Sequence, residues 1–341
     1  MIYSGWRASV AAMVMAAVLG LTASVALAQD KVRLGALRFT SHSGAFVAFE
    51  KGYFEEEGLD VEFHFFQAAA PMAVAIASGD IDYGVTAISG GLINLAGKGA
   101  IKVIGGALVE EVGVDGQKIL VSNQAWDDGV TTPAMLAGRS FGITQTGSSF
   151  HYMISQIAAM EGFALSEVSL KPLQKVGAVI GALKSGQIDG WTIVPHIAKA
   201  LAGGGAVRII GNVADYIDTY QVTAIFTSSA NASDKRDLTT RFLRAYSKGI
   251  ADFNANMVDR TGGEAGLEST TRLIHRYVYT SRPYEKAAPS IRNGSMRLQP
   301  DARLNLASVR HQLEWFKSEG LVDEGITIDQ LVDTSYVEID D

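Results

Sequence analysis

Short apolar runs alternate with segments of helical spacing along the first two thirds of the chain. The short runs predict buried strands because Gly, Ser and Thr bound them, whereas the longer segments have the spacing of amphipathic helices. Strands that alternate with helices favour mostly parallel sheets. We expect strands over 32–37, 61–66, 103–108, 119–122, 140–144, 168–173, 207–211 and 222–227.

Two parts of the chain repeat this order. Residues 75–87 read AIASGDIDYGVTA and residues 182–194 read ALKSGQIDGWTIV. In each, a helix ends at Ser-Gly, where Gly accepts the left-handed conformation of a helix cap, and a short strand follows. Gly-x-Ile-Asp is also a common helix-to-strand connector, but the match extends upstream, where residues 37–46 align with 143–152. The repeat therefore predicts two β-α-β-α-β units.

The repeated aspartates, Asp82 and Asp189, occupy equivalent places in the two motifs. This equivalence indicates a structural role at the strand end rather than a paired acid and base. The apolar segments Ile119–Ser122 and Val222–Thr227 are interpreted as the two crossings between the regions.

From residue 234 onward the pattern is helical, with amphipathic helices expected over 238–251, 269–278 and 301–319. We interpret these helices as returning to the first region. In open α/β sheets, ligands bind at the carboxyl ends of the strands. The sequence thus predicts an α/β fold of two lobes with one cleft between them.

The first 28 residues have the pattern of a secretory signal. Arg7 precedes an apolar run, and Ala26-Leu27-Ala28 forms a small-x-small cleavage site. An uncleaved membrane anchor is the alternative, because the run approaches the length of a membrane span. Cysteine is absent from the chain, which excludes disulfides, thiolate metal sites and a cysteine nucleophile. We predict a periplasmic protein.

Charge and motifs narrow the functional classes. The net charge is −7, and removal of residues 1–28 takes away only Arg7, leaving 28 basic and 36 acidic residues. The sequence has no dense basic run, which argues against nucleic-acid binding. It also has no P-loop, no G-x-S-x-G nucleophile elbow and no HExxH. We therefore predict a protein without cofactor or metal; a periplasmic enzyme remains the alternative class.

The loops after the first strand of each unit carry the candidate chemistry. Thr40, Ser41 and His42 lie in the first loop, and Ser148 and Ser149 lie in the second. Both loops precede helices, whose N-termini attract anions. The hydroxyl groups either help to hold a small anion or serve only as helix caps.

Other residues near the strand ends have two interpretations each. Trp191 either borders the ligand or fills the core, and Gln67 follows the second strand within reach of a ligand. Arg38 pairs with an anionic ligand or with a nearby acid. The histidines His42, His151 and His196 either meet in the cleft or make single hydrogen bonds.

Several longer stretches resemble periplasmic substrate-binding proteins of ABC importers, in the branch for sulfonates, taurine, nitrate and the pyrimidine precursor of thiamine. They are GYFEEEGLDV, AIASGDIDYG, LAGRSFGITQTGSSFHYMISQIAAMEGF, ALKSGQIDGWTIVPHIAKAL and the tail EWFKSEGLVDEGITIDQLVDTSYV. The resemblance implies the type II two-lobed fold, with a signal peptide at 1–28, lobe I at 29–120 and 223–341, lobe II at 121–222, two hinge strands and closure on the ligand.

The resemblance also implies a function and a set of ligand contacts. It implies a monomer that captures a small organic anion, either a sulfonate or an aromatic carboxylate, and delivers it to the transmembrane subunits of a permease. A neutral heteroaromatic, such as a thiamine pyrimidine precursor, and nitrate are the alternatives. The first loop, SHSGAF, departs from the family pattern, as does the Thr-Ile-Val-Pro run after Trp191. The predicted ligand-binding residues are Thr40, Ser41, His42, Gln67, Ile88, Ser148, Ser149, His151, Trp191 and His196.

Overall fold

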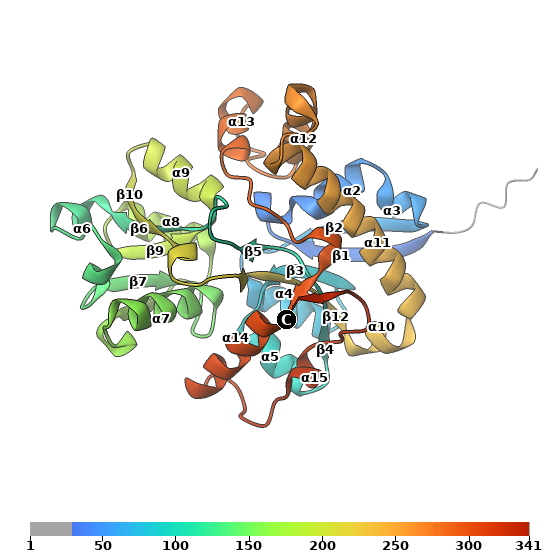
Figure 1. The fold of residues 1–341 in the computed structure, drawn as a ribbon, viewed down its shortest axis with the longest axis horizontal. Coiled ribbons are helices and arrows are strands. Elements are labelled where there is room, and N and C mark those ends of the chain that lie inside the picture. The colour runs from blue at the N-terminus through green and yellow to red at the C-terminus, as the bar shows by residue number, and fades with distance from the viewer. Residues whose placement is uncertain (1–28, 341) are drawn as a thin grey trace, which may run out of the picture.

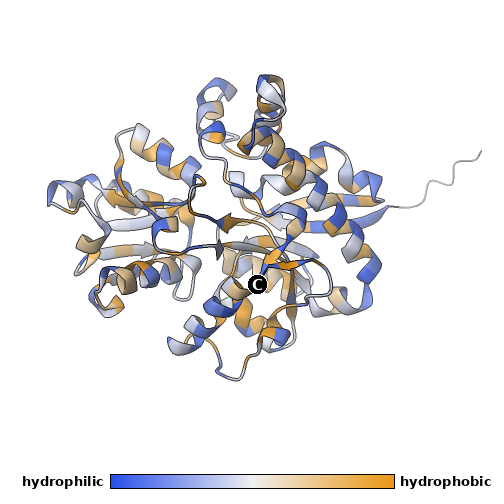
Figure 2. Ribbon diagram, viewed as in Figure 1, coloured by the Kyte–Doolittle hydropathy of each residue, from blue (hydrophilic) through white to orange (hydrophobic). Residues whose placement is uncertain are grey.

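The computed structural model describes residues 29–340, so the predicted signal peptide lies outside the described residues. Figure 1 shows two lobes, each built around a five-stranded sheet with helices on its faces. Hydrophobic residues gather on the strands of both sheets, and hydrophilic residues lie on the outer turns of the helices (Figure 2). Within residues 29–340, no helix has the length and apolar character that a membrane span requires.

The sheet of lobe I has the strand order β2-β1-β3-β12-β4. Strands β1, β2 and β3 are parallel, whereas β12 runs antiparallel to both of its neighbours. The strands are β1 (Asp30–Ala36), β2 (Leu59–Phe65), β3 (Tyr83–Ala87), β4 (Ile101–Gly106) and β12 (Thr223–Ser228). The helices between them are α2 (Ser43–Glu50), α3 (Tyr53–Glu56), α4 (Ala69–Ala77) and α5 (Gly90–Gly97).

The sheet of lobe II has the order β10-β6-β9-β7-β8, with β6 as its antiparallel strand. Its strands are β6 (Lys118–Ser122), β7 (Ser140–Ile143), β8 (Ser169–Pro172), β9 (Gly190–Ile193) and β10 (Val207–Asn212). Its helices are α6 (Asn123–Asp127), α7 (Ser149–Glu161), α8 (Val176–Lys184) and α9 (Pro195–Gly203). The two units that the repeat predicted thus have the same strand order, β2-β1-β3 and β8-β7-β9.

The hydrogen bonds of the two repeated aspartates show which residues of the two units are equivalent. Asp82 accepts the backbone N–H of Arg33 at 2.8 Å, and Asp189 accepts the backbone N–H of Ser140 at 2.8 Å. Each aspartate therefore ties the end of one helix-strand connection to the first parallel strand of its sheet. Asp189 follows Asp82 by 107 positions, and Ser140 follows Arg33 by the same number. The alignment of 37–46 with 143–152 is consequently wrong by one residue.

The two segments interpreted as crossings form strands, as predicted, but these strands lie within the sheets rather than between the lobes. Segment 119–122 belongs to β6 and segment 222–227 belongs largely to β12. A strand that is buried on both faces has the same apolar pattern wherever it lies, so the pattern did not separate the two roles. The chain crosses between lobes at 107–117 and 213–222, where β5 (Val109–Glu110) pairs antiparallel with β11 (Tyr220–Gln221). The proposed boundary at residue 120 falls inside β6.

The chain after the return crossing packs on lobe I, as expected. Its helices are α10 (Ser229–Asp234), α11 (Arg236–Phe253), α12 (Gly263–His275), α13 (Tyr284–Arg292), α14 (Leu306–Ser318) and α15 (Ile328–Leu331), and β13 (Leu304–Asn305) pairs with β14 (Ile339–Asp340). Phe242 of α11 stacks on Tyr83 of β3, with 4.2 Å between ring centroids. Ion pairs join α11 to α3, including Lys248 with Glu56 at 2.9 Å.

Candidate functional site

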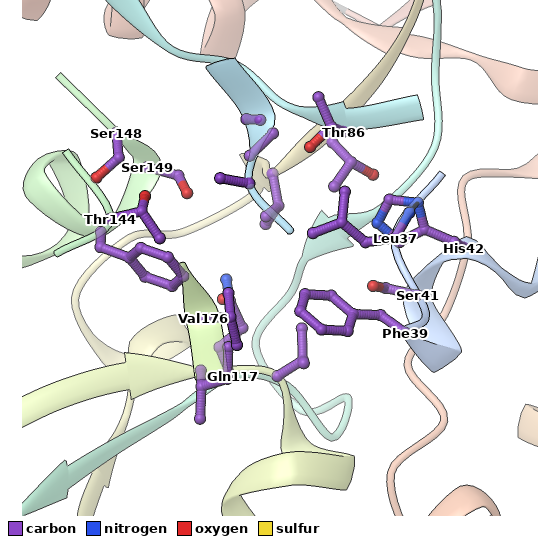
Figure 3. A pocket seen from close by; sticks show the side chains of 18 residues that line it. Leu37, Phe39, Ser41, His42, Thr86, Gln117, Thr144, Ser148, Ser149 and Val176 are labelled. Carbon is purple, nitrogen blue, oxygen red and sulfur yellow. Dashed lines mark hydrogen bonds between the residues drawn. The ribbon is translucent and has the colours of Figure 1, made fainter. Parts of the chain in front are cut away.

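A cavity lies between the two lobes where the carboxyl ends of the parallel strands face each other. Its volume is about 550 Å³, including its opening to solvent. Figure 3 shows Ser148, Ser149 and Thr144 on one side and Ser41, His42, Thr86 and Phe39 on the other. The cavity is lined by Leu37, Phe39, Ser41, His42, Ala68, Ala69, Thr86, Ala87, Gln117, Thr144, Ser148, Ser149, Phe150, Val176, Ile193, Val194, Val222 and Thr223.

The repeat supplies most of this lining in pairs. Six lining residues of lobe I have a lining counterpart 107 positions later in lobe II. The pairs are Leu37 with Thr144, Ser41 with Ser148, His42 with Ser149, Ala69 with Val176, Thr86 with Ile193, and Ala87 with Val194. The crossing segments add Gln117 and Val222. The cavity is therefore built from equivalent strand ends and helix starts of the two units.

The start of α7 places two hydroxyl groups in the lining of the cavity. Ser148 is the residue before this helix, and its hydroxyl group makes no cap hydrogen bond. Its Oγ is buried and has no partner among the described residues. The N–H groups in the first turn of a helix also lack intrahelical acceptors. The hydroxyl groups of Ser148 and Ser149 and the start of α7 thus offer several hydrogen bonds to one ligand group.

The cavity carries no formal charge on the side chains that line it among residues 29–340. The one histidine in the lining is His42, and burial lowers its pKa to about 3, so the ring is neutral. Its Nδ1 accepts the backbone N–H of Leu37 at 3.4 Å, which leaves the proton on Nε2. Arg38 lies outside the cavity lining, with its guanidinium 3.7 Å from the ring centroid of Phe65 and bonded to the carbonyl of Tyr277.

His196 joins the lobes rather than lining the cavity. Its Nδ1 lies 2.9 Å from the hydroxyl group of Thr40, which donates its proton to the carbonyl of Gly294 at 2.8 Å. Because a hydroxyl group has one proton, Thr40 must accept from His196, so the neutral ring carries its proton on Nδ1. Burial lowers the pKa of His196 to about 3, and nearby His42 adds to the effect.

Further contacts close the lobes on each other. The hydroxyl group of Tyr279 donates to the carbonyl of His196 at 2.9 Å, and Lys199 donates to the carbonyl of Asn293 at 2.9 Å. Near the other end of the cleft, the N–H of Gly90 donates to the carbonyl of Gly147 at 2.9 Å. The described structure is therefore a closed arrangement of the two lobes.

The predicted ligand residues divide into three groups. Ser41, His42, Ser148 and Ser149 line the cavity, while Thr40 and His196 make the contact between lobes. The others lie outside the lining: Gln67, Ile88, His151 and Trp191.

The residues outside the lining have structural contacts of their own. Trp191 is fully buried and packs behind Phe150, with 5.5 Å between ring centroids. The Nδ1 of His151 accepts the N–H of Gly147 at 3.1 Å. Ile88 is a buried core residue, and Gln67 contributes its backbone carbonyl to the N–H of Val176 at 3.4 Å.

Sequence reasoning missed several lining residues. Thr86 and Ala87 end the first repeated motif, and Ile193 and Val194 end the second, so the repeat itself marked both strand ends. Gln117 lies in a crossing segment whose composition carries no signal for a site. Only the paired crossings place it at the cavity.

Solved structures with the same architecture come from several bacteria. The alkanesulfonate-binding protein SsuA of Xanthomonas axonopodis pv. citri, bound to MOPS, is 17% identical with a TM-score of 0.70, over 90% of this chain and 99% of that one. The periplasmic aliphatic sulphonate-binding protein SsuA of Escherichia coli is 18% identical with a TM-score of 0.70, over 92% and 94%. The periplasmic nitrate-binding protein NrtA of Synechocystis PCC 6803 is 14% identical with a TM-score of 0.70, over 89% and 86%.

At these identities the likeness shows the fold, which is the two-lobed fold of periplasmic binding proteins that the sequence predicted. A comparison with curated protein sequences finds no match. The family described as NMT1/THI5 like matches residues 39–256, which is more than half of the chain. The chain therefore belongs to the NMT1/THI5-like family.

Proposed function

We propose that this protein is the periplasmic solute-binding component of an ABC importer and that it captures a small organic anion, a sulfonate or an aromatic carboxylate. The observation that carries the proposal is the cavity between the lobes, whose lining is mostly apolar and includes the hydroxyl groups of Ser148 and Ser149 at the start of α7. A helix N-terminus with free N–H groups holds an anion without a cationic side chain. The apolar body of the ligand then packs against residues such as Phe39 and Val176.

A neutral heteroaromatic is the second candidate ligand, because the lining within residues 29–340 provides no cation. A thiamine pyrimidine precursor is an example of this class. Nitrate fits less well, because it has no apolar surface to cover the aliphatic and aromatic walls. An enzymatic role has little support, since the lining offers no acid among the described residues and the chain has no cysteine.

Delivery to the transmembrane subunits of a permease and a monomeric state complete the proposal. The exported protein is expected to begin near Gln29, after cleavage of the signal peptide. Delivery to a permease and the monomeric state follow from the family resemblance. The start near Gln29 follows from the signal-like N-terminus.

Calorimetric titration of the protein purified from the periplasm tests the proposal. The probes are benzenesulfonate, benzoate, 2-aminopyrimidine and nitrate. Saturable binding of either organic anion, with the probe recovered unchanged, supports the proposed function. Binding of 2-aminopyrimidine alone favours the neutral heteroaromatic ligand. Turnover of a probe, or no binding of any probe, contradicts the proposal that the protein is a carrier of small organic anions.

A further inference from the structure

The hinge contains a buried acid around which the chain is folded. Glu110 lies in β5, opposite Tyr220 of β11, and is fully buried. Its Oε1 accepts the backbone N–H of Gln117 at 2.8 Å. A Cβ at Gly116 would lie 1.8 Å from the same oxygen, so only glycine lets the backbone pass this close to the carboxyl group.

Gln117 connects this carboxyl group to the ligand cavity. Its side chain lines the cavity, and Figure 3 shows it reaching into the space between the lobes. The backbone N–H of the same residue is bonded to Glu110, which places the base of the Gln117 side chain next to the carboxyl group. Two atoms of the pair, Glu110 Oε2 and Gln117 Nε2, are buried and have no partner among the described residues. Unpaired buried polar atoms are costly, so this pair is incomplete without a ligand or a change in proton position.

We propose that Glu110 orients the side-chain amide of Gln117 and thereby sets whether the hinge offers the ligand a hydrogen-bond donor or an acceptor. An amide has an NH2 group on one side and a carbonyl oxygen on the other, and a half turn exchanges them. An ionised Glu110 accepts from the NH2 group, which leaves the carbonyl oxygen toward the cavity. A protonated Glu110 donates to the carbonyl oxygen, which turns the NH2 group toward the ligand.

Both proton states are accessible near neutral pH. Burial raises the pKa of Glu110 to about 7, against the opposing effects of Gln117, whose backbone N–H donates to the carboxyl group, and of the charge of Lys118. Asp115 raises this pKa further. The facing residue Tyr220 is itself fully buried, and burial holds its pKa well above the ordinary value, so its hydroxyl group stays neutral.

This inference rests on the proposed function and specifies the hydrogen-bond character of its ligand. A sulfonate or carboxylate group has only acceptor atoms. It therefore pairs with the NH2 group of Gln117 and binds more tightly when Glu110 is protonated. A ligand that leaves a buried polar group of the site unpaired binds much more weakly than a ligand that pairs with that group.

The test is the pH dependence of benzenesulfonate binding, measured by calorimetry between pH 6 and 8.5. In the natural protein the affinity should fall at least about fivefold as pH rises through 7, the factor that corresponds to about 1 kcal/mol. Glu110→Gln should bind with the same affinity across this range, because its neutral amide donates to Gln117 at every pH. Asp115→Asn, which removes a neighbouring charge on the same segment, should keep the fall but shift it to lower pH, because Asp115 raises the pKa of Glu110.

Gln117→Met separates the proposal from simple repulsion between Glu110 and the anion. Orientation through the amide predicts that this variant loses the pH dependence, whereas direct repulsion predicts that it keeps it. The proposal is overturned if Gln117→Met or Glu110→Gln retains the natural pH profile. Circular dichroism checks folding, and if Glu110→Gln does not fold, Gln117→Met decides alone. If the natural protein binds neither benzenesulfonate nor benzoate at any pH, the proposed function fails first and the inference falls with it.

Discussion

The two lobes share one backbone plan but present different side chains to the cleft. Of the six lining pairs spaced by 107 residues, only Ser41 and Ser148 are identical. Lobe I contributes a histidine where lobe II has Ser149, and lobe II contributes the larger aliphatic residues at the second helix and third strand. The two walls of the cavity therefore differ in shape and in hydrogen-bonding groups.

Residues whose partner is the backbone show the opposite behaviour. Asp82 and Asp189 are identical and make the same hydrogen bond to a backbone N–H of the first parallel strand. Only their further contacts differ, since Asp82 also pairs with the guanidinium of Arg33 and Asp189 with the hydroxyl group of Ser140. The repeat therefore preserves the residues that bond the backbone and varies those that line the cavity.

In a third pair of equivalent residues, one residue caps a helix of its own lobe and the other contacts the opposite lobe. Ser89 caps α5 by accepting the N–H of Leu92 at 3.3 Å. Its counterpart 107 positions later is His196, which reaches the other lobe. The predictions below test these differences.

Gly294→Ala should have the largest effect on ligand affinity. The added methyl group would disrupt the contact of His196 with the other lobe. A Cβ at this position would lie 2.2 Å from the Cα of His196 and 2.4 Å from its backbone nitrogen. Closure would then require a backbone shift that costs roughly 1–3 kcal/mol. We expect ligand affinity to fall by about tenfold to a hundredfold, as measured by calorimetry with the best-binding probe.

Gly181→Ala in α8 is the matched control, since no atom lies within 4 Å of its added Cβ. It should leave the affinity unchanged. Equal affinities of the Gly294 variant and the control would show that closure does not depend on this contact.

Asp82→Ala and Asp189→Ala should destabilise the protein by similar amounts, about 2 kcal/mol each, since each loses a charge-assisted hydrogen bond to the backbone. The additional pair of Asp82 with Arg33 should add little, because that side chain is 41% exposed. Urea unfolding measures the change. Asp80→Ala, whose carboxylate bonds only the exposed hydroxyl group of Ser78, is the control. A difference well above 1 kcal/mol between the two variants would contradict their equivalence.

Replacement of Ser148 and Ser149 by Ala should reduce affinity for benzenesulfonate at least about tenfold, since each hydrogen bond to a charged group contributes roughly 1.5–3 kcal/mol. The melting temperature should change little, because the hydroxyl group of Ser148 caps nothing. Ser41→Ala should have the smallest effect, since Ser41 lies within a short 3-10 turn, Thr40–His42, rather than before a long helix. Unchanged affinity in the double variant would reject α7 as the anion-binding end of the cleft.

The sequence by itself determined the two units and their elements. The Ser-Gly-x-Ile-Asp motifs depend on local physics, namely a glycine cap and a strand start, so residues 75–87 and 182–194 revealed the repeat. The same repeat placed Ser41, His42, Ser148 and Ser149 at helix starts, and all four line the cavity. The family and the two-lobed fold followed from these stretches.

Only the tertiary structure decided which residues join the two lobes and which strands pair within each sheet. Thr40 and His196 were predicted to contact a ligand, but they bond each other across the cleft, a contact between residues 156 positions apart. Segments 119–122 and 222–227 entered the sheets because strand pairing is set by distant partners, not by local hydrophobicity. Gln117 reaches the cavity because two crossings pair through β5 and β11. Long-range contacts of this kind leave no periodic trace in a single sequence.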